Sequence, residues 1–205
     1  MRSLSWCVVL GSLMSLSVVA HAGESPWTFK VGGSYVMPKS NNGALASGAI
    51  EADVSSEVGF TPSIEYKFSP NLVGEVLLAI PFEHEVKNSL NDSKVATFKH
   101  LPPTFFAKWL MTPGAELSPY VGLGLNYTLV FDEELDGGGG KLKGDDSFGV
   151  AALAGFEYRA AGSPWGIALD VRYIKIESDL TLNGKDIGTL TVDPLVFGVS
   201  AAFHY

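Results

Sequence analysis

Residues 58–68 read VGFTPSIEYKF and alternate between apolar side chains and polar or small ones. Val58 and Phe60 fall on one parity of this stretch, whereas Glu65 and Lys67 fall on the other. Successive side chains of a β-strand point to opposite faces, so the period of two predicts a strand with one apolar and one polar face. The rest of the chain has to decide whether the apolar face meets a protein core or lipid.

The same alternation recurs along the chain and predicts eight strands. Each covers about the 9 to 11 residues, or slightly more, that a tilted strand needs to cross the hydrocarbon layer. The longest uncharged stretch beyond the N-terminal segment, 117–131, also alternates and therefore does not have the pattern of a membrane helix. The predicted strands are 27–37, 58–68, 72–82, 101–111, 119–131, 147–159, 165–176 and 193–205.

The connections between these strands are alternately long and short. The long ones are 38–57, 83–100, 132–146 and 177–192, and the short ones are 69–71, 112–114 and 160–164. Outer-membrane barrels combine short periplasmic turns with longer extracellular loops on an even number of antiparallel strands. The pattern predicts an all-β fold, an eight-stranded antiparallel transmembrane β-barrel with both termini in the periplasm.

Composition and aromatic placement favour lipid as the environment of the apolar faces. Only 18% of the 205 residues are charged, against about 25% in an average soluble domain. Aromatic residues collect at both strand ends, as in the girdles of membrane barrels. One girdle is Trp27, Tyr66, Phe68, Trp109, Tyr158, Trp165, Phe203 and Tyr205, and the other is Tyr35, Phe60, Phe82, Phe131, Phe148 and Tyr173. Scattered aromatics in a soluble β-sandwich remain the alternative.

The N-terminal segment has the pattern of a cleaved signal peptide. Arg2 precedes an uncharged, largely apolar run over 4–19, and Ala20-His21-Ala22 provides a small-x-small cleavage site. We therefore expect residues 1–22 to be removed and 23–205 to form the barrel in the outer membrane of a Gram-negative bacterium. A transmembrane anchor is the alternative for the first segment. The net charge of −8 argues against a nucleic-acid partner.

Several motifs in order resemble the OmpW family of small outer-membrane proteins. The resemblance covers essentially all of 23–205 and implies an eight-stranded barrel linked to the passage of small hydrophobic molecules. The motifs are IPFEH at 80–84, LPPT at 101–104, SPYVGLGLNYT at 118–128, ALDVRYI at 168–174 and VDP at 192–194. One departure is Glu75 in LVGE, since it places an ionisable side chain where the resemblance implies a more neutral lining.

The inward parity of the predicted strands divides the lumen into two halves. Near the long loops the inward residues are apolar: Val36, Leu77, Ala79, Phe106, Val130, Leu153, Ile174, Ile176 and Val196. Near the short turns they are charged: Lys30, Glu65, Lys67, Glu75, Lys108, Glu157, Arg159, Asp170 and Arg172. We interpret this as an apolar funnel open to the outside and closed below by paired charges. The alternative is a small barrel that fills its own interior and transports nothing.

Three prolines suggest how a solute would leave a funnel whose lower end is closed. Pro81 ends the third predicted strand, and Pro102 and Pro103 begin the fourth, so the three rings should lie close together across one hairpin. Each ring removes a backbone donor from the ladder, a defect tolerated in hydrocarbon only where it lines a cavity or opening. We therefore predict a lateral gap at this point. The alternative is that the prolines end the strands just above the membrane.

The last strand ends in Phe203 and Tyr205 on its apolar row, a pattern resembling the signal recognised by the outer-membrane assembly machinery. We expect this machinery, outer-membrane lipid, lipopolysaccharide and small hydrophobic solutes as partners. His84, His100 and His204 are dispersed in the sequence and are expected to be solvated, without forming a metal or catalytic site.

We find no converging nucleophile and base, and expect no cofactor and no enzymatic activity. The function predicted is passive uptake of small hydrophobic molecules with lateral exit into the outer leaflet. A structural, adhesive or receptor barrel that binds bacteriocins or host surfaces without transport remains open. A lipid-modifying enzyme would need the converging pair that the sequence does not offer.

Overall fold

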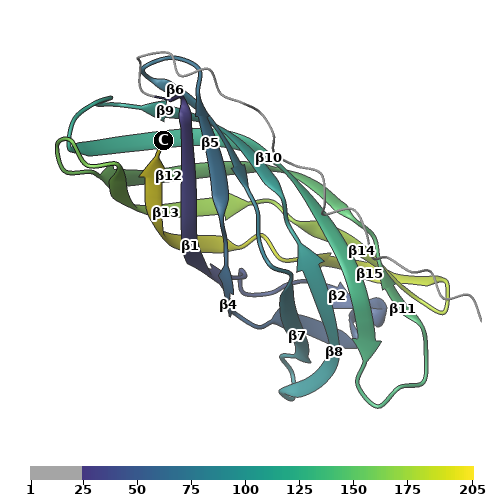
Figure 1. Ribbon diagram of the computed structural model, residues 1–205. Coiled ribbons are helices and arrows are strands. Elements are labelled where there is room, and N and C mark those ends of the chain that lie inside the picture. Colours follow the sequence, from purple (N-terminus) through teal and green to yellow (C-terminus); the bar gives the residue numbers. More distant parts are fainter. Residues whose placement is uncertain (1–24) are drawn as a thin grey trace, which may run out of the picture.

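The computed structural model describes residues 25–205, so the expected signal peptide lies outside the described residues. Eight antiparallel strands close into a barrel, as the sequence predicts (Figure 1). Because β1 pairs with β16 on one side and with β4 and β5 on the other, the barrel has no free edge. Its staves are β1 (Trp27–Met37), β4 (Glu57–Phe60) with β5 (Ser63–Lys67), β6 (Leu72–Leu77), β9 (Thr104–Leu110), β10 (Leu117–Leu135), β12 (Ser147–Tyr158), β13 (Trp165–Ile174) and β16 (Leu195–His204).

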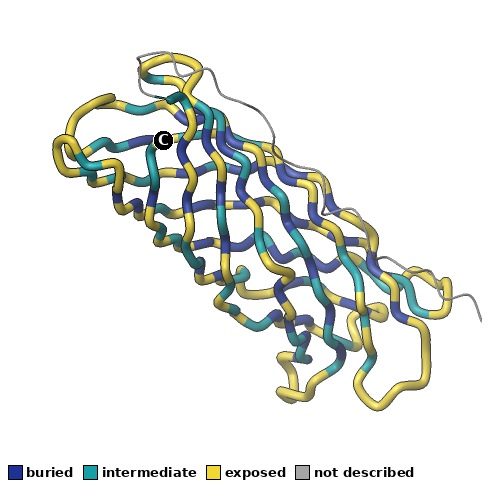
Figure 2. Tube along the Cα trace, viewed as in Figure 1, coloured by how far each residue is buried: buried dark blue, intermediate teal, exposed yellow. Residues whose placement is uncertain are grey.

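Burial alternates along the staves (Figure 2). The apolar parity is the exposed one. Val58 is 76% exposed and Leu123 73% exposed, whereas Glu65 is only 6% exposed. A water-soluble sandwich would show the opposite arrangement, with its largest apolar side chains inside. The apolar face of 58–68 therefore lies on the outside of the barrel, and its charged face lies in the lumen.

Prolines account for most differences between the predicted and observed strand ends. The second predicted strand is divided by Thr61 and Pro62 into β4 and β5, and the fourth begins at Thr104, after Pro102 and Pro103. The third ends at Leu77 instead of continuing to residue 82. A proline has no N–H to donate to a ladder, so pairing stops beside it.

The long connections form a second layer of structure that the sequence reasoning did not predict. We call it the loop extension; it stands on the barrel end opposite the C-terminus (Figure 1). One wall pairs β3, β7 and β8 with the upper part of β10, and the other pairs β11, β14 and β15. Its elements are β2 (Ala44–Leu45), the 3₁₀ turn η1 (Ala46–Gly48), β3 (Ile50–Val54), β7 (Phe82–Asn88), β8 (Ser93–Leu101), β11 (Leu142–Gly144), β14 (Glu177–Leu182) and β15 (Lys185–Thr191).

Phe82 corrects one expectation about the outer girdle. Inward parity is odd along β6 but even along β7, because the chain changes register between Leu77 and Phe82. Phe82 is therefore buried in the lumen, and its ring lies so close to Gly59 that a larger residue there would require the ring to move. Across residues 25–205, no helix is long and apolar enough to cross a membrane.

Candidate functional site

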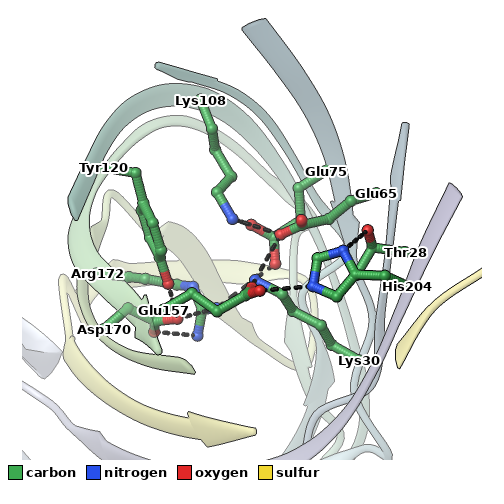
Figure 3. Close-up of polar contacts among 10 residues, drawn as sticks. All are labelled: Thr28, Lys30, Glu65, Glu75, Lys108, Tyr120, Glu157, Asp170, Arg172 and His204. Atoms are coloured by element: carbon green, nitrogen blue, oxygen red, sulfur yellow. Dashed lines mark hydrogen bonds and ion pairs between the residues drawn. The ribbon is translucent and has the colours of Figure 1, made fainter. Parts of the chain in front are cut away.

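Charged side chains from neighbouring staves meet inside the barrel near the end that carries the C-terminus (Figure 3). The Nζ atom of Lys30 on β1 lies 2.7 Å from Oε1 of Glu65 on β5. Lys108 on β9 donates to the same Glu65 oxygen, and its Nζ lies 3.3 Å from Oε2 of Glu75 on β6. All four residues are at most 6% exposed. Each charge is therefore removed from bulk water and placed against a charge of opposite sign.

The network continues across the lumen to β13. The Nη1 atom of Arg172 lies 2.8 Å from Oδ1 of Asp170, and its Nη2 atom lies 3.6 Å from Oε1 of Glu75. The Tyr120 hydroxyl donates to Asp170 at 3.3 Å, and the Lys108 ammonium stands 4.0 Å from the centre of the Tyr120 ring. The tyrosine was missed because a search for ionisable pairs passes over a phenol, although its inward parity on β10 indicates its place.

A histidine and a threonine complete the network at its outer margin. Nε2 of His204 lies 2.5 Å from Oε1 of Glu157, and its Nδ1 lies 3.1 Å from the Thr28 hydroxyl. Glu157 also lies 3.6 Å from Lys30. His204 is thus half-buried in a side-chain network rather than solvated, which corrects the expectation for this residue.

The structure brings together seven of the nine charges predicted for the lower lumen. These seven are Lys30, Glu65, Glu75, Lys108, Glu157, Asp170 and Arg172. We call the seven charged residues, together with Thr28, Tyr120 and His204, the charged floor. Lys67 is exposed and Arg159 half-buried, and neither forms an ion pair within residues 25–205. Both line the cleft that leads up to the floor from the barrel mouth.

The opposite half of the lumen contains an apolar cavity of about 100 Å³, the upper cavity. All four long connections between the staves contribute to its walls, so it is lined by parts of the chain that are far apart in sequence. Of the predicted lumen residues, Val130 and Ile176 line it. Other apolar residues in the wall include Leu45, Val86, Ala96, Phe98, Leu142, Leu180 and Leu190.

A smaller cavity of about 20 Å³, the lower cavity, lies beside the prolines. Six predicted lumen residues line it: Val36, Leu77, Ala79, Ile174, Ile176 and Val196. Phe106 and Leu153, also predicted, are buried but line neither cavity. His100 and Ile176 line both cavities and therefore stand at the boundary between them.

The pairing between the third and fourth staves is interrupted next to the lower cavity. The ladder runs to Leu77 opposite Thr104 and resumes at Phe82 opposite His100. Between these points Leu78 and Ile80 donate instead to the second stave, at Pro62 and Phe60. We call this interruption, which contains Pro81, Pro102 and Pro103, the proline break. Pro102 is buried and lines the lower cavity, Pro103 is half-buried, and Pro81 is exposed.

Leu78 lies both at the lower cavity and at the outer surface of the barrel. Its side chain is 42% exposed, yet it also lines the lower cavity together with Ala79 and Pro102. The carbonyl of Pro103 accepts from the Tyr127 amide at 3.1 Å, so the fourth stave keeps its pairing with β10. The interruption is confined to the side that faces the third stave.

His84 and His100 are stacked and buried, contrary to the expectation that they are solvated. Their ring centroids are 4.8 Å apart and their planes differ by 5°. They face each other diagonally across β7 and β8, a relation that requires the hairpin register and cannot be recognised from two dispersed histidines. Within residues 25–205, no group of three or more His, Cys, Asp or Glu side chains is placed to hold a metal ion.

Burial lowers the pKa of both rings. The outward face of β7 and β8 carries ion pairs such as Lys94–Glu85, so this hairpin lies outside the apolar belt of the barrel. Desolvation, reinforced by the neighbouring His84, lowers the pKa of His100 to about 3. Desolvation also lowers the pKa of His84, against its hydrogen bond to the Ser55 carbonyl. Both imidazoles are therefore neutral at neutral pH.

A closed eight-stranded barrel with apolar side chains outside and charges inside defines an outer-membrane β-barrel protein. Residues 25–205 match the model of the OmpW family, and the chain belongs to that family. This confirms the resemblance seen in the sequence motifs and the outer-membrane location. The terminal orientation and the removal of residues 1–22 stay predictions.

Two curated relatives and one solved structure illustrate the similarity. Outer membrane protein W of Vibrio cholerae serotype O1 is 33% identical over 217 residues, which span 100% of this chain and 99% of the relative. The dibenzothiophene metabolism operon protein PahQ of Pseudomonas aeruginosa is 23% identical over 198 residues, 92% of either chain. The crystal structure of OprG from Pseudomonas aeruginosa superimposes with a TM-score of 0.76 at 27% identity, covering 89% of this chain and 97% of that one.

Proposed function

We propose that this barrel is a passage for the passive uptake of small hydrophobic molecules across the outer leaflet. The observation that carries the proposal is the contrast along one lumen: an apolar cavity stands above a packed floor of charges. Transfer of apolar surface out of water favours entry of an apolar solute into such a cavity. A polar solute would lose its hydration there without finding partners, so it would be rejected.

The proposed exit is the proline break, used as a lateral gap. The charged floor lies below the lower cavity and offers an apolar solute only ion-paired side chains. Leu78 and Ala79 instead lead from the lower cavity towards the outer surface. The third and fourth staves are not paired there, so a solute could pass between them without breaking hydrogen bonds of the sheet. A solute leaving at this point would enter lipid, which suits its apolar character.

The family supports a role connected with apolar compounds. The name of the relative PahQ places that protein with dibenzothiophene metabolism, and dibenzothiophene is an apolar polycyclic compound. This chain resembles PahQ over almost its whole length. We therefore assign an apolar rather than an ionic substrate class to this barrel.

The direct test compares the uptake of toluene and of a size-matched polar solute by cells with and without the protein. We expect the protein to accelerate toluene uptake and to leave uptake of the polar solute unchanged. Equal uptake of both solutes in the two strains would refute the passage. It would favour the alternative of a structural, adhesive or receptor barrel that binds host surfaces or bacteriocins.

The exit route has its own test, the triple substitution of Pro81, Pro102 and Pro103 by Val. Valine restores backbone donors on both sides of the proline break, so pairing between the staves can extend and close the gap. We expect a folded barrel with slower toluene uptake. A matched control replaces Pro113 by Val in the short turn at the other end of the barrel. Unchanged uptake by a folded triple variant would eliminate the lateral route.

We also propose that the C-terminal strand serves as the assembly signal. Tyr205 is 62% exposed, and its amide donates to the Trp27 carbonyl at 3.2 Å, while the Phe203 ring lies 4.8 Å from that of Trp165. One such hydrogen bond contributes little to a finished barrel, so deletion of Tyr205 should act on assembly. We expect less heat-modifiable barrel in the outer membrane but unchanged refolding of purified protein in detergent. Wild-type membrane levels would contradict this assignment.

A further inference from the structure

His100 has an unused hydrogen-bonding atom beside the two cavities that the proposed passage uses. Its side chain is 1% exposed, and its Nδ1 has no hydrogen-bond partner within residues 25–205. A buried polar atom without a partner costs free energy relative to one that is paired. His100 lines both the upper and the lower cavity, so its ring lies next to the path proposed for a ligand that moves between them.

The other polar side chains in the wall of the upper cavity already have partners. Thr128 donates to Asn126 Oδ1 at 2.6 Å, and Ser178 donates to the Asp145 carbonyl at 2.6 Å. Glu133 accepts from the Gly144 amide at 2.8 Å. Both hydroxyl protons are thus committed within the protein. His100 differs from these groups because its Nδ1 has no hydrogen-bond partner within residues 25–205.

The stacked neighbour of His100 holds the ring in place without satisfying it. His84 Nδ1 lies 2.6 Å from the Ser55 carbonyl oxygen, which can only accept, so His84 donates from Nδ1 and carries its free lone pair on Nε2. Parallel stacking at 4.8 Å between centroids allows no in-plane hydrogen bond between the two imidazoles. The centroid of the Phe82 ring lies 5.6 Å from the centroid of the His100 ring.

We propose that the barrel selects small apolar molecules that carry one hydroxyl group, such as phenols and simple alcohols, and that His100 is the hydrogen-bond partner of that hydroxyl. A neutral imidazole donates from one nitrogen and accepts at the other. Nδ1 is therefore either an unpaired donor or an unpaired acceptor, according to the tautomer. A hydroxyl satisfies either case, a ketone or ether satisfies only the first, and a hydrocarbon satisfies neither.

This inference rests on the proposed function, because it names the solute class of the same apolar passage. The test therefore uses two probes that differ only by a hydroxyl, toluene and p-cresol. Binding of each to the full barrel in lipid nanodiscs is measured by titration calorimetry, and partitioning into nanodiscs without protein is subtracted. We expect saturable binding of both probes, with p-cresol favoured by about tenfold, or about 1.4 kcal/mol.

Substitutions at His100 separate hydrogen bonding from ring packing. H100F keeps an aromatic ring but removes both nitrogens, so the tenfold preference for p-cresol should disappear while toluene affinity is retained. H100N places an amide near the position of Nδ1 and should keep part of the preference. H84F preserves the stacked ring at a position that lines neither cavity, and it is the control in which the preference should be unchanged. E133Q removes the charge in the wall and tests whether this carboxylate, rather than His100, binds the hydroxyl.

The possible results distinguish the two proposals. Saturable binding of both probes with a preference that survives H100F would overturn the role of His100 and leave the apolar passage intact. Loss of the preference in E133Q instead of H100F would assign the hydroxyl to the carboxylate and would equally overturn it. Absence of saturable toluene binding to the wild-type barrel would count against the passage itself. A ¹⁵N shift of the His100 ring with p-cresol and not with toluene would support the proposed contact directly.

Discussion

The two ends of this lumen are built by the same rule and contain opposite chemistry. Along each stave, alternate residues point inward, yet those near the C-terminal end are charged and packed, whereas those near the loop extension are apolar and leave space. At the charged floor, Lys108 is enclosed by Glu65, Glu75 and the ring of Tyr120. Around the upper cavity, Val130 and Leu190 face empty volume.

The difference shows how a narrow barrel can have one charged end and one apolar end in the same lumen. An eight-stranded interior is just wide enough for side chains to fill it, so a cavity forms only where the inward side chains leave space unoccupied. Here the apolar side chains inside the loop extension leave a cavity of about 100 Å³, whereas the end of the barrel near the C-terminus is filled by charges that need one another. A buried charge network tolerates the loss of a member poorly, whereas an apolar cavity tolerates additions.

The largest effect is expected from removing one cation of the floor. Lys108→Met keeps the length of the side chain but leaves Glu65 and Glu75 without their shared partner. We expect a loss of about 3–5 kcal/mol in the free energy of unfolding, measured by urea titration in lipid vesicles, as for other broken buried pairs. Lys67→Met, at an exposed position of the same charge, should change stability by no more than about 0.5 kcal/mol. Equal, small effects would mean that water reaches the floor.

A smaller effect on stability, but a clear effect on uptake, is expected from filling the upper cavity. Ala96 is buried in its wall, so Ala96→Phe directs an aromatic ring into the empty volume. We expect the barrel to fold with a cost of about 1–3 kcal/mol or less, and toluene uptake to fall towards that of cells without the protein. The matched control is Ala154→Phe on the lipid-facing side of β12. Normal uptake by folded Ala96→Phe would place the passage elsewhere.

The smallest effect is a pH dependence confined to the loop extension. In the unfolded chain His84 and His100 protonate near pH 6.5, but in the folded protein burial lowers the pKa of His100 to about 3. The unfolded state therefore binds more protons between these values. The contribution of His100 to the free energy of unfolding is constant above about pH 6.5 and declines as the pH falls below it. Burial lowers the pKa of His84 as well, but the hydrogen bond to the Ser55 carbonyl and the nearby Glu57 oppose this shift and so reduce the share of His84.

Amide hydrogen exchange across β7 and β8 at pH 8 and pH 5 measures this dependence. Faster exchange is expected at pH 5 in the wild type, beyond the intrinsic pH effect on exchange, and not in the doubly substituted His84→Phe, His100→Phe protein. The barrel staves, whose hydrogen bonds do not depend on these rings, serve as the internal reference. Equal protection at both values in the wild type would show that the two rings remain accessible to protons.

The barrel could be predicted from the sequence because its signal is local and repeated. A period of two, as in 58–68, and the alternation of long and short connections require no knowledge of tertiary contacts. The lumen charges could also be predicted, since inward parity alone places Lys30, Glu75 and Arg172 in one interior. Lys67 and Arg159 were included by the same parity, but they lie too near the barrel mouth to be enclosed.

The loop extension could not be predicted in the same way, because its pairings join distant parts of the chain. The parity of the third stave changes between Leu77 and Phe82, and nothing in the sequence states which residue absorbs the change. The stacking of His84 on His100 depends on that register. Tyr120, an uncharged side chain that contacts Asp170 and Lys108 in the lumen, is likewise missed by a search for opposite charges.

The measurement that tests this account most directly is the ionic conductance of the barrel in a planar lipid bilayer. If the charged floor closes the lumen below an apolar cavity, the folded protein should show no large, stable conductance, while the same preparation in vesicles accelerates the transfer of toluene. Lys108→Met, if it folds, should loosen the floor and give measurable current. A large, stable conductance in the wild-type protein would contradict the account, since it would require a continuous path of water through the floor.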